Sequence, residues 1–189
     1  IHIWDLEKAS YQWLENDTTL LNRTYRLEHL APHIAGTQVS GGVLVQAANH
    51  FEDTDMMLEA AAATDWIKGV VGWLPLTDPE AAGNALTGKY LENNYFKGCR
   101  HLIHNEADPC WLLQDTVIES LEILAAQGLT YDIVGVNTTH LRTAIAVAAR
   151  VPELKMVLDH LNQPPISSGE KFGEWGELMK IAAQHKNIY

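Results

Sequence analysis

Two histidines and one arginine are the residues of this sequence best suited to chemistry. His2, Arg100 and His160 each lie in or directly after a short apolar run. A neutral imidazole can ligate a divalent metal or polarise a carbonyl group. A planar guanidinium can hold a carboxylate through two parallel hydrogen bonds. If these three side chains converge, they form a site for a small polar substrate.

Other polar residues occupy equivalent places along the chain. Parallel α/β folds build their sites at the carboxyl ends of the strands, so polar residues that end an apolar run are candidates to meet there. The full set is His2 with Trp4 and Asp5, Gln46, Arg100 with His101 and His104, Asp132, and Asp159 with His160.

A structural interpretation competes with the functional one for many of these side chains. A single histidine is more often a hydrogen-bonded core residue than a ligand, and this holds for His2 or His160 alone. Tryptophan side chains suit packing as well as a substrate platform, which leaves Trp4, Trp73 and Trp111 open. We expect five other histidines to be ordinary helix or loop residues: His29, His33, His50, His140 and His185. We expect four acidic residues to be solvated charges: Asp17, Glu52, Asp53 and Asp55.

An alternation of strands and helices must position the candidate residues. Short β-branched runs ending in polar residues are followed by stretches with helical spacing, and strand starts recur at roughly the length of a βαβ unit. The strands are almost continuously apolar, as parallel strands covered on both faces are. The expected strands are Ile1 to Trp4, Val39 to Ala48, Ile67 to Leu76, Phe96 to Ile103, Leu129 to Val136, and Leu154 to Leu161.

Two intervening stretches have the clearest helical pattern. In the first, one apolar face is followed by Gly128 as a C-terminal stop, and in the second the pattern ends at Pro152. The apolar positions are Val117, Ile118, Leu121, Leu124 and Ala125 in the first stretch, and Leu141, Ala144, Ile145 and Ala148 in the second.

The strand count leaves two architectures open. Six strands fit an open doubly wound sheet, although no glycine-rich phosphate-binding motif accompanies them. A closed (β/α)₈ barrel needs eight strands and about 250 residues. On that reading, residues 1–189 form a single barrel domain that covers about the first six βα units. The sequence would then be incomplete at both ends, with a seventh strand starting at Asn187-Ile188-Tyr189.

Composition narrows the class of protein further. Apolar residues make up 47% and charged residues 20%, which is typical of a globular protein, and no run approaches the length of a membrane helix. A net charge of −11 disfavours nucleic acid and anionic membranes as partners. Cys99 and Cys110 form no disulfide framework, so we expect reduced thiols in a cytoplasmic protein. A homo-oligomer is compatible with these features.

Four stretches together resemble one known family. They are His2-Ile3-Trp4-Asp5-Leu6, Gly69-Val70-Val71-Gly72-Trp73, Lys97 to Ile103, and Val157-Leu158-Asp159-His160-Leu161. In this order they are similar to the amidohydrolase-2 family, in the sugar lactonase branch that includes L-fuconolactonase, L-rhamnonolactonase and 2-pyrone-4,6-dicarboxylate lactonase. The resemblance implies a (β/α)₈ TIM barrel of the metal-dependent hydrolase type.

The resemblance also implies a reaction and a set of site residues. Family members begin with a His-x-His pair, of which His2 matches the second histidine, and His160 matches a histidine of strand six. The first histidine of the pair and the aspartate of the last strand have no counterpart in residues 1–189. The implied activity is hydrolysis of a sugar-acid lactone, with His2 and His160 as catalytic residues and ligands of a divalent Zn or Mn ion. The implied substrate-binding residues are Trp4, Gln46, Arg100 and His101.

One departure from the family bears on the substrate. Asn162-Gln163 follows His160 where relatives often have a lysine or arginine, which indicates a less acidic substrate than a dicarboxylate. Two other functions stay open: a non-oxidative decarboxylase of the same superfamily, which would release CO₂, and a non-catalytic degenerate barrel that binds a sugar acid without turnover.

Overall fold

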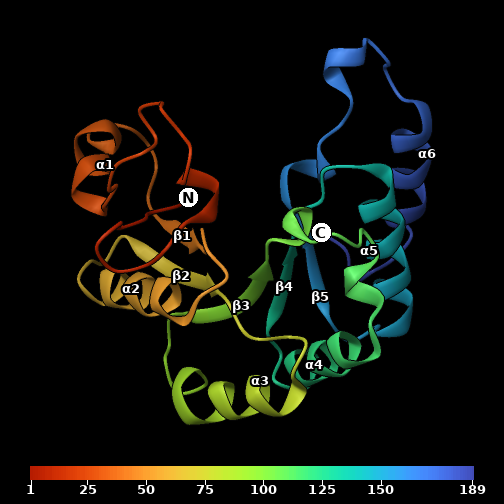
Figure 1. Ribbon diagram of the computed structural model, residues 1–189, viewed down its shortest axis with the longest axis horizontal. Helices are drawn as coiled ribbons and strands as arrows, with labels where there is room; N and C mark the ends of the chain where they lie inside the picture. Colours follow the sequence, from red (N-terminus) through yellow and green to blue (C-terminus); the bar gives the residue numbers. More distant parts are fainter.

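A curled parallel sheet organises the α/β fold of this protein, of which the computed structural model describes all residues from 1 to 189 (Figure 1). Its five strands pair in the order in which they follow in the chain, from β1 to β5. A doubly wound sheet would reverse its strand order at a switch point, so the sequential order excludes that architecture. The result is a half-barrel.

The strands are shorter than the sequence pattern predicts, although each lies within a predicted range. The residues that flank each strand within its predicted range lie outside the regular strand. The strands are β1 (Gly42–Val45), β2 (Ile67–Gly72), β3 (Phe96–His101), β4 (Thr130–Ile133) and β5 (Lys155–Leu158).

Helices connect successive strands and lie along the outside of the curled sheet (Figure 1). The longer ones are α1 (Leu27–Ile34), α2 (Phe51–Ala62), α3 (Pro79–Ala85), α4 (Asp115–Ala126), α5 (Thr138–Arg150) and α6 (Gly173–Ala182). Short helical turns are η1 (Gln12–Leu14), η2 (Leu86–Tyr90), η3 (Ile103–Asn105), η4 (Trp111–Leu113), η5 (Asp159–Asn162) and η6 (Ile166–Ser168).

The expected first strand is only partly formed. The amino group of Ile1 donates to the carbonyl of Val43 at 2.9 Å, and Ile1 accepts from the amide of Val45 at 2.9 Å. The chain then leaves β1, because Trp4 pairs with Tyr25 in an isolated antiparallel bridge. The prediction of a regular strand at Ile1 to Trp4 is therefore wrong, but this segment still lies against β1.

The other edge of the sheet carries a similar short pairing. Ile188 forms a parallel bridge with Met156 of β5. The amide of Met156 donates to Asn187 at 2.8 Å, and that of Leu158 donates to Tyr189 at 2.9 Å. Asn187 to Tyr189 thus pairs with β5 as a following parallel strand would.

The two predicted amphipathic helices are confirmed as α4 and α5. In α4 the apolar face is buried under β4, and the chain turns at Gly128, whose φ of +69° glycine adopts without strain. In α5, Leu141, Ala144 and Ala148 are buried, and the helix ends at Arg150, two residues before Pro152.

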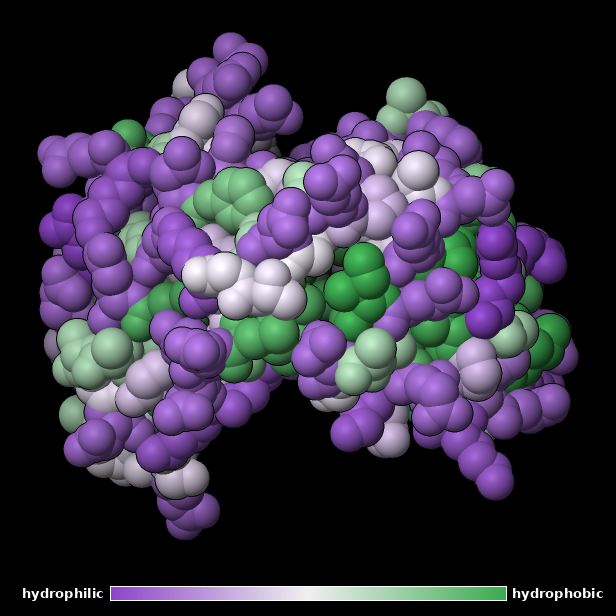
Figure 2. Space-filling view, turned by 90° about the horizontal axis from the view of Figure 1, so that it is seen from below, coloured by the Kyte–Doolittle hydropathy of each residue, from purple (hydrophilic) through white to green (hydrophobic).

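Two apolar clusters support the sheet. The larger joins 36 buried residues from strands and helices, and the smaller holds Trp4, Tyr11, Leu14, Ala47 and Ala48 beneath the N-terminal segment. Figure 2 shows apolar patches between hydrophilic margins on the face seen from below. Cys99 and Cys110 are both free thiols, as predicted. None of the helices combines the length and apolar character needed to span a lipid bilayer.

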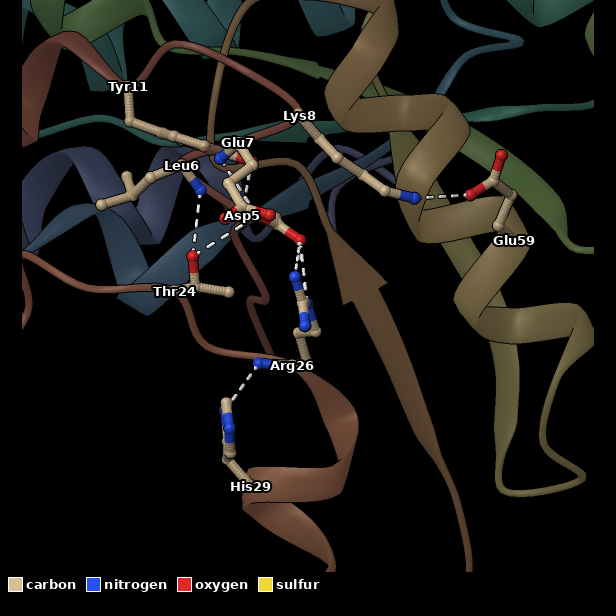
Figure 3. A network of polar contacts seen from close by, with 9 residues as sticks. All are labelled: Asp5, Leu6, Glu7, Lys8, Tyr11, Thr24, Arg26, His29 and Glu59. Atoms are coloured by element: carbon tan, nitrogen blue, oxygen red, sulfur yellow. Dashed lines mark hydrogen bonds and ion pairs between the residues drawn. The ribbon is translucent and has the colours of Figure 1, made fainter.

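An ion pair fastens the N-terminal segment to the start of α1 (Figure 3). The Nε and Nη2 atoms of Arg26 donate to one carboxylate oxygen of Asp5 at 2.8 and 2.5 Å. Asp5 is only 1% exposed. Burial opposes ionisation of this carboxyl, but hydrogen bonds from Arg26 and from the amide of Glu7 outweigh it and lower the pKa of Asp5.

We predict that Arg26→Met destabilises the protein at pH 7 and that the loss shrinks in acid. The lowered pKa of Asp5 contributes stability above its unfolded value of about 3.9, and this contribution disappears as pH falls through the lower folded value. Urea unfolding of both proteins between pH 3 and 8 measures the effect. Lys8→Met is the matched control, because Lys8 pairs at the surface with Glu59 (2.8 Å). A loss independent of pH would contradict this account.

Candidate active site

A cavity of about 270 Å³ opens at the carboxyl ends of the first strands. It is lined by the N-terminal segment, by a residue after β1 and by residues at and after the end of β3. Its lining residues are His2, Trp4, Trp13, Ala47, Arg100, Leu102 and His104. Three of the predicted site residues, His2, Trp4 and Arg100, are therefore brought together from distant parts of the chain.

His2 is held with one ring nitrogen free. Its Nδ1 lies 2.8 Å from the carbonyl oxygen of Val45, and a carbonyl can only accept, so Nδ1 carries the proton. Nε2 then has a lone pair directed away from that bond. Partial burial, followed by the positive charge of Arg100, lowers the pKa of His2, although the ring still reaches solvent. The imidazole is thus neutral at pH 7 and can bind a metal or accept a proton.

Arg100 connects three strand ends. Its Nη1 donates to Asp159 at 2.7 Å, and its Nη2 donates to the main-chain carbonyl of Gln46. The side chain is buried, and Nε has no partner. Two of the five N–H groups of the guanidinium are engaged with the protein, so Arg100 does not offer a ligand the free two-pronged grip that the sequence suggested.

Gln46 lies beneath Arg100, outside the cavity lining. Its amide nitrogen donates to the carbonyl of Arg100 and to Asn49 Oδ1, both at 3.0 Å. Gln46 and Arg100 therefore exchange hydrogen bonds between the ends of β1 and β3. In this geometry Gln46 positions Arg100, and its buried Oε1 has no partner within the chain.

His101 belongs to a neighbouring cluster. Its ring stacks on Trp111 with centroids 4.0 Å apart, and Trp73 Nε1 donates to its Nδ1 at 3.1 Å. The Nε2 atom lies 2.7 Å from Glu106, to which it donates, and Asn49 also approaches it. Burial lowers the pKa of His101, partly offset by Glu106. Both ring nitrogens are occupied, and His101 does not line the cavity.

His160 lies on a turn of unusual backbone conformation. It is exposed and is absent from the cavity lining, although the preceding Asp159 binds Arg100. The four residues from His160 to Gln163 all have φ between 47° and 53°, a left-handed conformation that is costly for residues with side chains. Such strain persists only where surrounding contacts enforce it.

Contacts of the next residues enforce this turn. Asn162 is fully buried and donates to the carbonyl of Asn137 at 2.9 Å, and Trp175 donates to the carbonyl of Leu161 at 2.9 Å. Gly135 lies directly against Asn162, because an added Cβ there would be 1.7 Å from Asn162 Oδ1. Gly135 and Asn162 were not identified as supports from the sequence.

Asp53 corrects one expectation. The sequence predicted a solvated charge, but Asp53 is fully buried in the first turn of α2. It accepts from the amides of Ala47 (2.9 Å) and Ala48 (3.4 Å) and from the hydroxyl of Tyr11 (3.0 Å). Burial raises its pKa to about 6 against these hydrogen bonds. Its burial could have been inferred from its position soon after β1, where a carboxylate can accept hydrogen bonds from the amides of the connecting loop.

The chain brings no complete set of metal ligands together. Among all 189 residues, no group of three or more histidine, cysteine, aspartate or glutamate side chains is arranged to hold an ion. His2 presents a free ring nitrogen, and its other ring nitrogen makes a hydrogen bond of the kind that orients metal-binding imidazoles. The residues described therefore do not make a metal site by themselves.

A larger cavity of about 450 Å³ lies away from this chemistry, between the N-terminal segment, α1 and α2. Four of its five charged side chains are paired with one another, Lys8 with Glu59 and Arg26 with Asp5 (Figure 3). No strand end contributes to it, so the smaller cavity at His2 and Arg100 is the better candidate.

Comparison with known proteins identifies the family. The amidohydrolase family model matches residues 1–189, so the chain belongs to the amidohydrolase family, as its resemblance indicated. It is 30% identical over 189 residues to an L-fucono-1,5-lactonase of Burkholderia ambifaria, covering 100% of this chain and 63% of that protein. An L-fucono-1,5-lactonase of Burkholderia multivorans is 27% identical over 171 residues, or 90% of this chain and 56% of that protein.

Solved structures agree with the fold. An amidohydrolase from Burkholderia multivorans with bound zinc superposes with a TM-score of 0.88 at 25% identity, over 99% of this chain and 65% of that one. A probable 2-pyrone-4,6-dicarboxylic acid hydrolase from Acinetobacter baumannii, with citric acid bound, gives 0.72 at 14% identity, over 95% and 63%. The chain thus spans about two thirds or less of each of these relatives.

We predict that Gly135→Ala and Asn162→Ala are not additive. Gly135→Ala forces the Asn162 side chain to move, which breaks its bond to Asn137 within the core and costs about 1–3 kcal/mol in free energy of unfolding. In the Asn162→Ala background the two closest atoms are gone and only His140 Cβ remains, 3.0 Å from the added methyl group, so the same change should cost less. Urea unfolding of the four proteins measures this coupling. Equal costs in both backgrounds would show that the two residues do not support one another.

Proposed function

We propose that this protein opens a sugar-acid lactone by hydrolysis, in a site around His2 and Arg100. The observation that carries the proposal is the shared cavity, whose lining brings together the imidazole of His2, with one free ring nitrogen, and the side chain of Arg100. Support comes from the family and from two relatives named as L-fucono-1,5-lactonases.

The proposed chemistry follows from the protonation states. Neutral His2 can accept a proton from water through Nε2, and the water oxygen attacks the ester carbonyl carbon. Negative charge develops on the carbonyl oxygen, and the positive charge of Arg100 beside the cavity stabilises that charge more than the neutral ester. The ring C–O bond then breaks, and the departing oxygen takes up a proton to give a hydroxy acid.

The residues that the sequence proposed as substrate contacts differ in whether they line this cavity. Trp4 lines it directly and forms an edge contact with Trp13, with ring centroids 5.2 Å apart. Such aromatic walls suit the less polar faces of a lactone ring. We propose that Gln46 acts through Arg100, and that His101 shapes the adjacent loop instead of binding substrate directly.

A metal, a closed barrel and a single domain over residues 1–189 are part of the proposal. A relative has bound zinc, and the family resemblance includes Zn or Mn held by His2 and His160. Since the chain does not gather these two residues with further ligands, the steps above assign no role to an ion. The sequential half-barrel is compatible with completion to a (β/α)₈ barrel, since short segments pair along both of its edges, at Ile1 beside β1 and at Ile188 beside β5.

We predict that His2→Gln lowers kcat for lactone opening by about 100-fold or more, because glutamine occupies similar space but cannot act as a base. Acid release from sugar-acid lactones, followed with a pH indicator on the full-length protein with and without chelator, measures the rate. His33→Gln is the control, as His33 is exposed on α1.

Three results of this screen would contradict the proposal. Wild-type activity in His2→Gln would remove His2 from the reaction. Release of CO₂ from an aromatic or sugar acid would identify a decarboxylase. Tight binding of sugar acids without turnover of any lactone would favour a non-catalytic barrel.

A further inference from the structure

One short segment of main chain holds three of the side chains that line the cavity at His2 and Arg100. It runs from Val45 to Ala47, across the end of β1. Its three successive carbonyls accept, in chain order, from His2 Nδ1 at 2.8 Å, from Arg100 Nη2, and from Trp13 Nε1 at 3.0 Å. All three donors line the cavity, so the position of this segment sets where the imidazole, the guanidinium and the indole lie relative to one another.

The last residue of this segment lies beyond the end of the sheet. The amides of Val45 and Gln46 still pair with neighbouring main chain, at 2.9 and 2.8 Å. The amide of Ala47 has no such partner and donates to Asp53 Oδ2 at 2.9 Å, as the amide of Ala48 does at 3.4 Å. Both alanines are buried, and a buried amide needs an acceptor. The carboxylate of Asp53 therefore takes over where the hydrogen bonds of the sheet end.

The same carboxylate reaches the N-terminal segment. Tyr11 donates its hydroxyl to Asp53 Oδ1 at 3.0 Å, and its oxygen accepts from the amide of Asp5 at 3.3 Å. Tyr11 precedes Trp13 by two residues, and their rings make an edge contact with centroids 6.4 Å apart. Asp53 thus supports both sides of the hydrogen bond between Trp13 and Ala47.

Stabilisation of a helix start does not account for these contacts. A carboxylate in the first turn of a helix often interacts with the amides of that turn. The hydrogen bonds of Asp53 go instead to Ala47, Ala48 and Tyr11, which all lie outside α2. Its side chain is fully buried between the helix and the two segments that form the cavity wall. Its contacts are therefore those of a support for the site.

We propose that Asp53 is a positioning residue of the candidate active site, which fixes the segment from Val45 to Ala47 and thereby holds His2, Arg100 and Trp13 in their working arrangement. This inference rests on the proposed lactone-opening function and adds a residue on which that function depends. Asp53 does not line the cavity, so it acts through the segment without touching substrate.

The first test compares kcat for lactone opening in full-length Asp53 variants whose folding is verified by circular dichroism. Asp53→Ala removes the acceptor of three hydrogen bonds and should lower kcat about 10-fold to 100-fold, because a misplacement of about 1 Å in reacting groups has effects of this size. Asp53→Asn should restore most of kcat, because its amide oxygen can accept from Ala47 while its NH₂ group donates to the oxygen of Tyr11.

Asp55→Ala is the matched control. Asp55 lies on the same helix and also accepts from a tyrosine hydroxyl, that of Tyr90, at 3.1 Å, but none of its contacts leads to the cavity. It should leave kcat unchanged. A loss of kcat in Asp55→Ala as large as in Asp53→Ala, or no rescue by Asp53→Asn, would reduce Asp53 to a general contributor to folding and overturn the inference.

A second measurement does not depend on activity. The indole N–H signal of Trp13 in a proton–nitrogen correlation spectrum, identified by its loss in Trp13→Phe, reports the hydrogen bond to Ala47. In Asp53→Ala this signal should shift and exchange faster with water, and in Asp55→Ala it should stay in place. If Asp53→Ala does not fold, Tyr11→Phe removes one of the three hydrogen bonds and should move the signal in the same direction.

The two measurements separate this inference from the proposed function. If wild type opens no lactone, the proposed function fails, and the Trp13 signal still decides whether Asp53 positions the segment. A signal that moves in Asp53→Ala and not in Asp55→Ala supports that role. An unmoved Trp13 signal, or wild-type kcat in Asp53→Ala of an active enzyme, overturns it.

Discussion

The ion pair between Arg100 and Asp159 is the interaction on which the candidate site depends. It joins the end of β3 to the turn after β5, while the second terminal nitrogen of Arg100 holds the carbonyl of Gln46 after β1. Three strand ends that are far apart in the sequence are thereby fixed around one buried cation. Taking both charges out of water is costly, and only good geometry with further hydrogen bonds repays it. The main effect of this ion pair is therefore to fix the positions of the strand ends, and its net contribution to the free energy of unfolding is small.

Other features of the site follow from this fixed position. Partial burial, followed by the positive charge of Arg100, lowers the pKa of His2, and the Arg100 side chain lines the same cavity. The carboxylate that pairs with Arg100 also precedes the strained turn at His160, so the same ion pair anchors the start of that turn. The buried contacts of Asn162 hold its other end.

Much of the fold could be predicted from sequence, and parts of the site could not. The alternation of apolar strands and amphipathic helices predicted β1 to β5, α4 and α5, because burial on both sides of a parallel sheet dictates that pattern. It failed at Trp4, where an aromatic cluster and the bridge to Tyr25 draw the chain away from β1. The position of Arg100 at a strand end could be predicted, but its pairing with Asp159 could not, because that depends on side-chain geometry. The burial of Asp53 depends on loop amides that no periodicity reveals.

A crystal structure of the full-length protein with a neutral sugar-acid lactone analogue bound would test the central claim most directly. We predict that the ligand occupies the cavity between His2 and Arg100, with its ester carbonyl group between these two side chains. A ligand seated in the larger cavity between α1 and α2, or one that contacts neither His2 nor Arg100, would contradict it.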